Sequence, residues 1–277
     1  MAHEEPINYY EYLRPNKKYP NVWCSGCGIG VVMGSLIRAI DRIGLDKNDV
    51  AVVSGIGCTG RMPVYMDFNT MHTTHGRALA FATGLKISRP KLHVIVVMGD
   101  GDAMAIGGNH FLHACRRNID MTAIVVNNWI YGMTGGQYSP TTPLNARATT
   151  APYGNVEQAM PICEVAAAAG ASYVARTTVY HATEMDKFLE AAIRKHGFSV
   201  VETVSYCHTT FGRLNKRGGV VDMMRWLKDN SVGQIAAQKL DEEEKAAKIV
   251  RGVVCDVEKP EYLDLYQQVI DRAMEAK

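Results

Sequence analysis

Long apolar runs are missing from this 277-residue sequence. Its apolar stretches, such as Val94–Met98, are far shorter than the roughly 20 residues that a membrane-spanning helix needs. The opening stretch MAHEEPINYYEYLRPNKKYP holds acids, tyrosines and prolines where a signal peptide needs an apolar core. We therefore expect neither a membrane span nor secretion, and we expect the protein to be cytoplasmic.

An excess of charge of one sign is also missing. The 30 Lys and Arg residues are nearly balanced by 28 Asp and Glu residues, which leaves a formal net charge of +2. The basic residues are scattered, without the basic stripe and interleaved aromatics that are typical of a nucleic-acid surface. We therefore expect no nucleic-acid partner.

Cysteine, by contrast, occurs seven times. In a reducing cytoplasm these residues favour thiolate ligands or buried thiols over disulfides. Cys24 and Cys27 are two residues apart in WCSGCG, a spacing that suits a redox dithiol, half of a zinc site or part of an iron–sulfur site. Cys115 and Cys163 fall in helical patterns, where a free cysteine usually acts as a small buried hydrophobe.

Apolar runs rich in β-branched residues alternate with amphipathic helical stretches along most of the chain. This order is typical of βα units and predicts an α/β fold, a mainly parallel sheet with helices on both faces. We expect strands ending near residues 55, 98, 128, 177 and 204, and helices at 28–45, 75–89, 107–118, 163–169 and 184–196. Residues 92–128 form a complete βαβ unit, whose two strands we expect to be parallel.

The end of the chain has a different character. From residue 218 onward it is polar and charged, as in KLDEEEKAAK, and predicts two or three solvated helices without an assigned function. We therefore divide the chain into a domain at 1–215 and a helical extension at 216–277. Within the domain, the stretch GGQYSPTTPLNARATTAPYGN is too long for an idle connection, and we expect it to cover a site.

Polar residues follow two neighbouring strands of the predicted sheet. Asp100 lies in the turn GDGD after one strand, and Asn127 and Asn128 end the next. The carboxyl ends of parallel strands meet at one edge, where a glycine-rich turn lets the backbone approach a diphosphate. Carboxylate and amide oxygens suit Mg²⁺. Asp or Asn alone is common in turns, but together they favour a Mg²⁺–diphosphate site.

Several motifs resemble a known family. GDG followed after 25 residues by NN resembles the thiamine diphosphate signature. WCSGCG, GIGCTGR, HTTHGRALAFATG and YGMTGGQYSPTTP resemble, in the family's order, blocks of the β subunit of 2-oxoacid:ferredoxin oxidoreductases. The resemblance covers roughly residues 23–213. It implies a thiamine diphosphate-binding fold and the reversible, coenzyme A-dependent oxidative decarboxylation of a 2-oxoacid, with electrons passing through a [4Fe–4S] cluster to ferredoxin.

The resemblance also implies ligands. It assigns Mg²⁺ to Asp100, Asn128 and the backbone carbonyl of Ile130, and the cluster to Cys24, Cys27, Cys58 and Cys207. One position departs from the family pattern: relatives often carry a proline just before the fourth of these cysteines, and here that position is Tyr206. Decarboxylation leaves an electron-rich carbon whose electrons a nearby cluster can take singly, whereas zinc has no redox chemistry and would only stabilise the fold.

The expected cofactor-binding residues come from four of these blocks. They are Gly57, Cys58, His75, Gly99, Asp100, Gly101, Asp102, Asn128, Ile130, Gly132, Met133 and Thr134. In YGMTGGQYSPTTP, the glycines leave backbone N–H groups accessible, and several side chains carry short hydroxyls. Both kinds of group suit a diphosphate or the mouth of a substrate channel. A surface loop with ordinary turn chemistry is the alternative.

We expect 2-oxoglutarate as the substrate and succinyl-CoA as the product, with pyruvate or a branched-chain 2-oxoacid as the alternative. The distal carboxylate of 2-oxoglutarate needs a cation, and arginine is its natural bidentate partner. Arg61 is the first candidate and Arg77 the second, although each could instead form a structural ion pair. The side chains of His72 and His75 could form hydrogen bonds with cofactor or substrate. Alternatively, they could form hydrogen bonds with the backbone at the start of a helix.

No acidic motif here matches the glutamate that activates the cofactor in this family, where it comes from the other subunit. The resemblance therefore implies an α-subunit partner, ferredoxin as carrier, a dimer of αβ heterodimers and no turnover by the isolated chain. Two alternatives stay open. One is a non-redox thiamine-dependent 2-oxoacid decarboxylase subunit with structural zinc. The other is a noncatalytic scaffold with a zinc-stapled N-terminus, which leaves the GDG-to-NN spacing unexplained.

Overall fold

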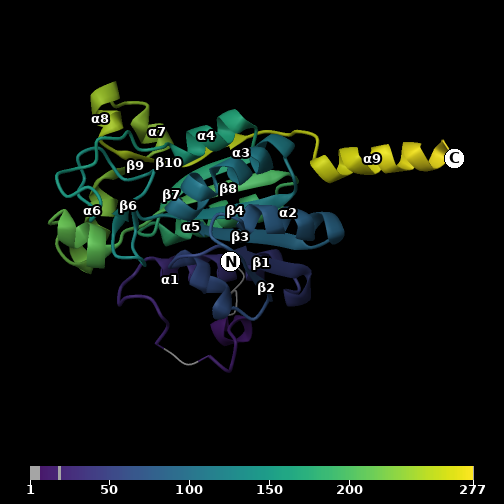
Figure 1. Cartoon of the computed structure of the whole chain (residues 1–277), viewed down its shortest axis with the longest axis horizontal. Coiled ribbons are helices and arrows are strands. Elements are labelled where there is room, and N and C mark those ends of the chain that lie inside the picture. Colours follow the sequence, from purple (N-terminus) through teal and green to yellow (C-terminus); the bar gives the residue numbers. More distant parts are fainter. Residues whose placement is uncertain (1–6, 18–19, 277) are drawn as a thin grey trace, which may run out of the picture.

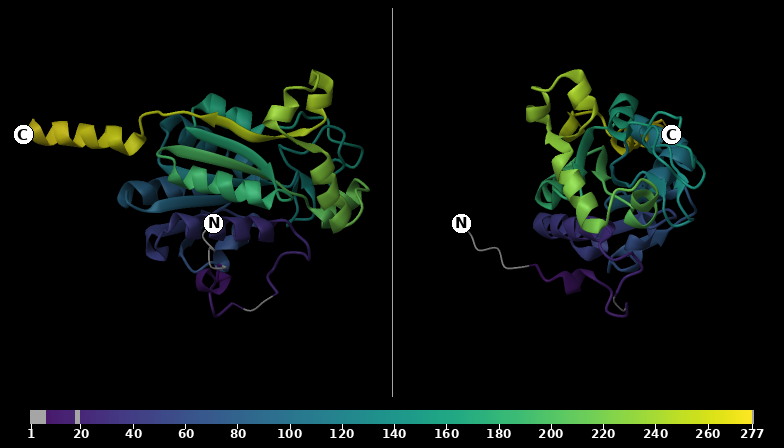
Figure 2. Two further views of the ribbon diagram at one scale, coloured as in Figure 1. Left: turned by 180° about the vertical axis from the view of Figure 1, so that it is seen from behind. Right: turned by 90° about the vertical axis from the view of Figure 1, so that its left-hand side faces the viewer.

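The computed structural model describes residues 7–17 and 20–276. An eight-stranded sheet lies at its centre (Figures 1 and 2). Its strands are β1 (Val50–Ser54), β2 (Asn69–His72), β3 (His93–Gly99), β4 (Met121–Asn127), β7 (Tyr173–Thr178), β8 (Phe198–Val204), β9 (Ser231–Gly233) and β10 (Ile249–Asp256). Their order is β2-β1-β3-β4-β8-β7-β10-β9, and the first six run parallel. The predicted mainly parallel sheet is confirmed.

Helices cover both faces of the sheet. They are α1 (Ile29–Ile43), α2 (Ala78–Ser88), α3 (Gly108–Arg117), α4 (Ile162–Ala169), α5 (Ala182–Arg194), α6 (Val220–Asp229), α7 (Gln234–Ala237), α8 (Glu242–Ala246) and α9 (Tyr262–Glu275). Buried residues of α1 and α5 share one apolar cluster, whereas those of α2, α3 and α4 lie in the other. The expected helices between residues 28 and 196 are thus present.

The two central strands position the candidate site. β3 and β4 are buried along nearly their whole length, because helices cover both faces, and this explains their continuous apolar sequence. They pair in parallel, with Gly99 opposite Val126, as the predicted βαβ unit requires. Asp100 and Asn128 directly follow the two strands, so they leave the sheet at the same edge.

The tail is not purely helical, in contrast to the extension predicted for residues 216–277. Besides α6 to α9 it contributes β10, which pairs antiparallel with β7. The segment IVRGVVCD places Arg251 and Gly252 inside an apolar run and is mostly half-buried, which breaks the alternation typical of a strand. The sequence also does not predict β2 or the small hairpin of β5 (Ile130–Tyr131) and β6 (Gln137–Tyr138). The boundary at residue 215 stays a prediction.

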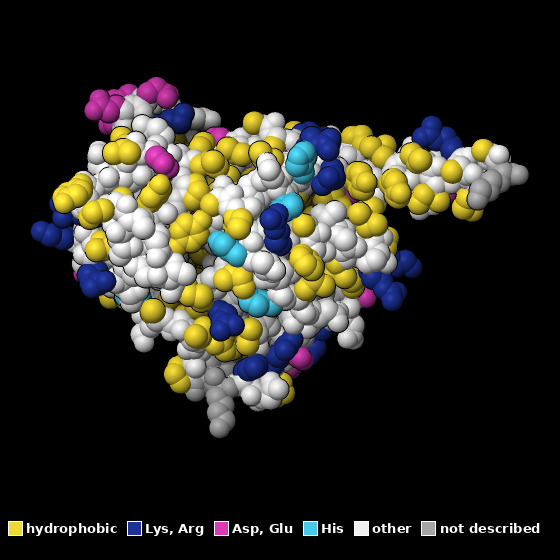
Figure 3. Space-filling view, in the orientation of Figure 1, with side chains coloured by type: hydrophobic (Ala, Val, Ile, Leu, Met, Phe, Trp, Pro, Cys, Tyr) yellow, Lys and Arg dark blue, Asp and Glu magenta, His cyan; other side chains and the backbone are white. Residues whose placement is uncertain are grey.

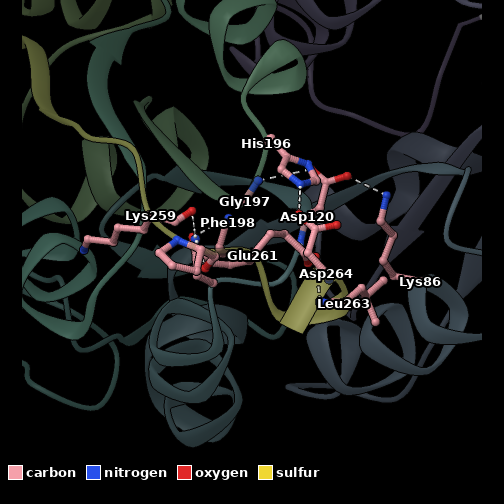
Figure 4. Close-up of polar contacts among 11 residues, drawn as sticks. Lys86, Asp120, His196, Gly197, Phe198, Lys259, Glu261, Leu263 and Asp264 are labelled. Atoms are coloured by element: carbon pink, nitrogen blue, oxygen red, sulfur yellow. Dashed lines mark hydrogen bonds and ion pairs between the residues drawn. The ribbon is translucent and has the colours of Figure 1, made fainter. Parts of the chain in front are cut away.

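Helix α9 projects from the body of the molecule (Figures 1 and 2), and each of its residues is at least partly exposed. Its start is held by Glu261, which is 2% exposed and accepts bonds from the backbone amides of Leu263, Asp264 and Asp120 (Figure 4). His196 Nε2 lies 2.7 Å from Asp264 Oδ2 in the same group. These contacts fix where the helix leaves the sheet.

Charged side chains are dispersed over the surface. On the face drawn in Figure 3, acidic side chains gather over α8, whose first turn holds Glu242, Glu243 and Glu244, while lysines and arginines occur singly and in small groups. Among the residues that the structure describes, no helix is both long and apolar enough to cross a membrane.

Candidate thiamine diphosphate site

Asp100 and Asn128 form the polar centre of the site. Asp100 is 2% exposed, and its Oδ2 accepts hydrogen bonds from Ser139 Oγ at 2.5 Å and Thr141 Oγ1 at 2.6 Å. Burial raises the pKa of Asp100, and the two hydroxyls oppose that shift. Asn128 Oδ1 is buried and has no hydrogen-bond partner, which costs about 1–3 kcal/mol unless a ligand satisfies it. A cation such as Mg²⁺ fits this pair of oxygens.

The residue between the predicted Mg²⁺ ligands has an unusual backbone. Trp129 has φ of 65°, which is rare for a bulky side chain. Its carbonyl accepts a hydrogen bond from Thr142 Oγ1 at 2.5 Å. Its indole ring lies 5.3 Å from the ring of Phe211 and 5.7 Å from that of Trp226. These contacts hold the turn that carries Asn128 and Ile130, and no pattern in the sequence signals them.

A cavity of about 170 Å³ opens beside this centre. It is lined by all of the expected cofactor residues and also by Ile56, Thr59 and Tyr131. Gly101 must be a glycine, because a Cβ there would overlap the Tyr131 ring, whose hydroxyl donates to the Gly101 carbonyl at 3.2 Å. The glycine-rich turns therefore let backbone form the cavity wall, as a diphosphate site requires.

Asp102 and His75 form a second polar pair in the cavity. His75 Nδ1 lies 2.7 Å from Asp102 Oδ1, although the two are not aligned as a hydrogen bond. Asp102 Oδ1 accepts instead from the Gly76 amide at 2.6 Å. Burial raises the pKa of Asp102, which the Gly76 bond and the nearby imidazole oppose. A Cβ on Gly55 would overlap the Asp102 carboxylate, so Gly55 makes room for it.

The cysteines expected to bind the cluster come from three separate segments. Cys24 and Cys27 lie in the turn before α1, Cys58 precedes the 3-10 helix Thr59–Val64, and Cys207 follows β8. Burial raises the pKa of Cys27 to about 11, and repulsion from the thiolates of the other three adds to the shift. The fold thus brings them within electrostatic reach of one another.

The sulfur positions bear on the choice between zinc and a cluster. Within the described residues, His196, Glu261 and Asp264 form a group of potential ligand atoms within 4.8 Å of one another, and the cysteines form none. A tetrahedral zinc ion with Zn–S bonds of about 2.3 Å holds its sulfurs about 3.8 Å apart. In this structure, therefore, no three cysteine sulfurs lie as close together as a bound zinc ion would hold them. In the His196 group, both Glu261 oxygens already accept backbone amides.

The arginines lie outside the cavity. Arg61 is exposed in the 3-10 helix that follows Cys58 and has no ion-pair partner among the described residues. Arg77 is also exposed and lies with Nη1 beside His110 Nε2. His72 contacts Ser54 Oγ through Nδ1 at 2.9 Å. Of the expected catalytic residues, therefore, only His75 lines the cavity.

Known proteins share this architecture. The model of the thiamine pyrophosphate enzyme C-terminal TPP-binding domain matches residues 50–203. The 2-oxoglutarate synthase subunit KorB of Methanocaldococcus jannaschii is 49% identical over 262 residues, which cover 95% of this chain and 97% of that protein. KorB of Archaeoglobus fulgidus is 55% identical over 222 residues, 80% of each chain. The chain belongs to the 2-oxoacid:ferredoxin oxidoreductase β-subunit family.

A solved member of this family has the same fold. The 2-oxoglutarate:ferredoxin oxidoreductase from Magnetococcus marinus, with 2-oxoglutarate, coenzyme A and succinyl-CoA bound, matches with a TM-score of 0.86 and 32% identity, covering 98% of this chain and 92% of that one. The family predicted from the motifs is thus confirmed, and an enzyme subunit is favoured over a scaffold. The similarity also extends past residue 213 into the tail, beyond the range that the motifs indicate.

Proposed function

We propose that this chain is the thiamine diphosphate-binding β subunit of a 2-oxoglutarate:ferredoxin oxidoreductase. Together with its α subunit it converts 2-oxoglutarate and coenzyme A into succinyl-CoA, CO₂, one proton and two electrons, and the reaction reverses when ferredoxin is sufficiently reduced. The names of the relatives and the ligands of the Magnetococcus marinus enzyme support this substrate. Pyruvate or a branched-chain 2-oxoacid is the alternative.

One observation favours the redox reaction over simple decarboxylation. The candidate cofactor cavity and the cysteine group adjoin each other, because Cys58 lines the cavity and a Cβ on Gly132, another lining residue, would lie 3.1 Å from Cys207 Sγ. When bound, thiamine diphosphate would supply the decarboxylating chemistry and a [4Fe–4S] cluster would pass electrons singly to ferredoxin. A structural zinc site would have no need to adjoin the cavity.

The chain's own residues have distinct proposed roles. Asp100, Asn128 and the Ile130 carbonyl would hold Mg²⁺, which satisfies the orphaned Asn128 oxygen. The Asp102 carboxylate lies beside Nδ1 of His75, so Nε2 would be the nitrogen available to cofactor or substrate. Arg61 stays the first candidate for the distal carboxylate, because it is exposed and unpaired within the described chain, whereas Arg77 contacts His110.

The proposal includes partners and a compartment. The β-subunit family implies an α subunit, which would supply the activating glutamate, and we propose a dimer of αβ heterodimers that reduces ferredoxin. The seven cysteines are all free thiols. Free thiols are typical of the cytoplasm, where we place the protein.

Anaerobic purification with the α subunit tests the proposal. We expect about four irons and four acid-labile sulfides per chain, as for a Cys₄ cluster, and an absorption band that 2-oxoglutarate and coenzyme A bleach together. The isolated chain should bind thiamine diphosphate but show no turnover. Zinc without iron would contradict the redox part of the proposal. If pyruvate bleaches the band and 2-oxoglutarate does not, pyruvate is the substrate.

A further inference from the structure

A group of exposed cationic side chains lies next to the cysteine group. We call this surface the cationic face, and it consists of Arg147, Arg213, Lys216 and Arg217, all of which are exposed. Arg213 Nε donates to the Thr209 carbonyl at 3.2 Å, and Thr209 Oγ1 lies 4.0 Å from Cys24 Sγ and 3.5 Å from Cys207 Sγ. The face therefore begins beside the sulfurs.

Asn215 joins the two chain segments that build the face. Its side chain accepts from the Arg147 amide at 2.7 Å and donates to the Arg147 carbonyl at 2.9 Å. Arg217 lies over the Trp226 ring, 5.4 Å from its centroid. Residues distant in sequence are thus held as one surface, which explains why the basic residues look scattered along the chain.

The charge of this face is not neutralised within the chain. Residues 20–32, 143–156 and 205–221, which contain Cys24, Cys27, Cys207 and the four cations, include no Asp or Glu. None of the face's four cations forms an ion pair with any residue the structure describes, although ion pairs are frequent elsewhere, as at Arg38, Arg176 and Lys195. Exposed unpaired cations attract an acidic partner and speed its encounter.

We propose that the cationic face is the docking surface for an acidic, one-electron-accepting iron–sulfur protein. The inference rests on the proposed function, since it takes the cysteine group as the place from which electrons leave. In each encounter one electron passes from the reduced centre to the oxidised carrier, with no bond or proton transferred. Cys24 is exposed at this face, whereas Cys27, Cys58 and Cys207 are partly buried, so the carrier approaches by the least covered cysteine.

The test compares charge reversals at matched sites in the complex with the α subunit. Arg147→Glu combined with Lys216→Glu changes two side chains of the face that make no hydrogen bond within the described residues. Lys91→Glu is the control, because Lys91 is exposed just before the amino end of β3, at the opposite edge of the sheet. The probe is an oxidised, acidic ferredoxin with two [4Fe–4S] clusters, and the readout is its Kd at several salt concentrations.

We expect the double variant to bind this ferredoxin at least about tenfold more weakly at low salt, and the difference to shrink at high salt as charges are screened. Lys91→Glu should bind like wild type. The Kd can be measured without enzymatic turnover. A lack of iron would therefore overturn the proposed function, and the effect of the charge reversals on the Kd could still be measured. Equal Kd values overturn the docking surface. Loss of the α subunit from the double variant assigns the face to that subunit, and a raised KM for coenzyme A with unchanged Kd assigns it to coenzyme A phosphates.

Discussion

Gly132 and Cys207 meet at the boundary between the cavity and the cysteine group. A Cβ on Gly132 would lie only 3.1 Å from Cys207 Sγ, so even Gly132→Ala must displace the sulfur or the loop. We expect this variant to contain less iron and to bind thiamine diphosphate more weakly. Gly84→Ala is the control, because nothing lies within 4 Å of a Cβ there. Unchanged iron content in Gly132→Ala would mean that the two sites are independent.

Removal of one cysteine should separate the two cofactors. Cys58→Ala deletes one of the predicted cluster ligands, and we expect iron to fall well below one cluster per chain while thiamine diphosphate still binds. Cys115→Ala is the matched control. Cys115 is fully buried, and burial raises its pKa to about 12, as for an inert thiol. Iron and sulfide analysis decides: full iron in Cys58→Ala would exclude it as a ligand.

The carboxylate of Asp100 should control the metal. Asp100→Asn keeps an oxygen that can accept from Ser139 and Thr141 but loses the charge that attracts Mg²⁺. We expect Mg²⁺-dependent binding of thiamine diphosphate to weaken at least about 10–100-fold in a calorimetric titration. Asp120→Asn, just before the amino end of β4, should bind normally. Wild-type binding by Asp100→Asn would remove Asp100 from the metal site.

The main features of the sheet and the candidate cavity could be predicted because their signals are local in the sequence. Strands β3 and β4 are almost entirely apolar because both faces are covered, and each ends directly at its polar residues. Glycine turns mark the cavity wall, because only glycine lets the backbone pass as closely as at Gly101. Patterns of this kind are visible in a single sequence.

Other features depend on contacts between distant segments. The backbone at Trp129 is held by rings at Phe211 and Trp226, and neither contact leaves a periodic pattern. The cationic face exists only because Asn215 joins its segment to that of Arg147. Strand β10 was not predictable, since an arginine and a glycine interrupt its apolar run.

The ion pair at the anchor of α9 should depend on pH. The hydrogen bond with Asp264 raises the pKa of His196, while partial burial opposes it. The pair therefore contributes stability below the unfolded pKa of about 6.5, and this contribution is lost as the pH rises through the higher folded value. Both side chains are more than half exposed, so solvent screening keeps the contribution small. An NMR titration should show the raised pKa fall in Asp264→Asn and stay unchanged in Asp271→Asn.

The turn at Trp129 gives the sharpest test of how the metal site is held. A non-glycine residue with positive φ costs roughly 1–3 kcal/mol, which the surrounding contacts must offset. Trp129→Ala keeps that strain but removes the ring that packs on Phe211 and Trp226. We therefore expect it to need about tenfold or more additional Mg²⁺ to bind thiamine diphosphate.

Two further variants distinguish positioning from a general loss of stability. Trp129→Phe retains an aromatic ring against Phe211 and should restore most of the Mg²⁺ affinity. Trp226→Ala removes one of the ring contacts without changing the strained residue, so it should give a smaller loss in the same direction. Thermal unfolding without cofactor supplies the comparison. If Trp129→Ala lowers Tm yet binds Mg²⁺ and thiamine diphosphate as wild type does, the bonds to Asn127 and Thr142 alone hold the turn, and the ring only stabilises the fold.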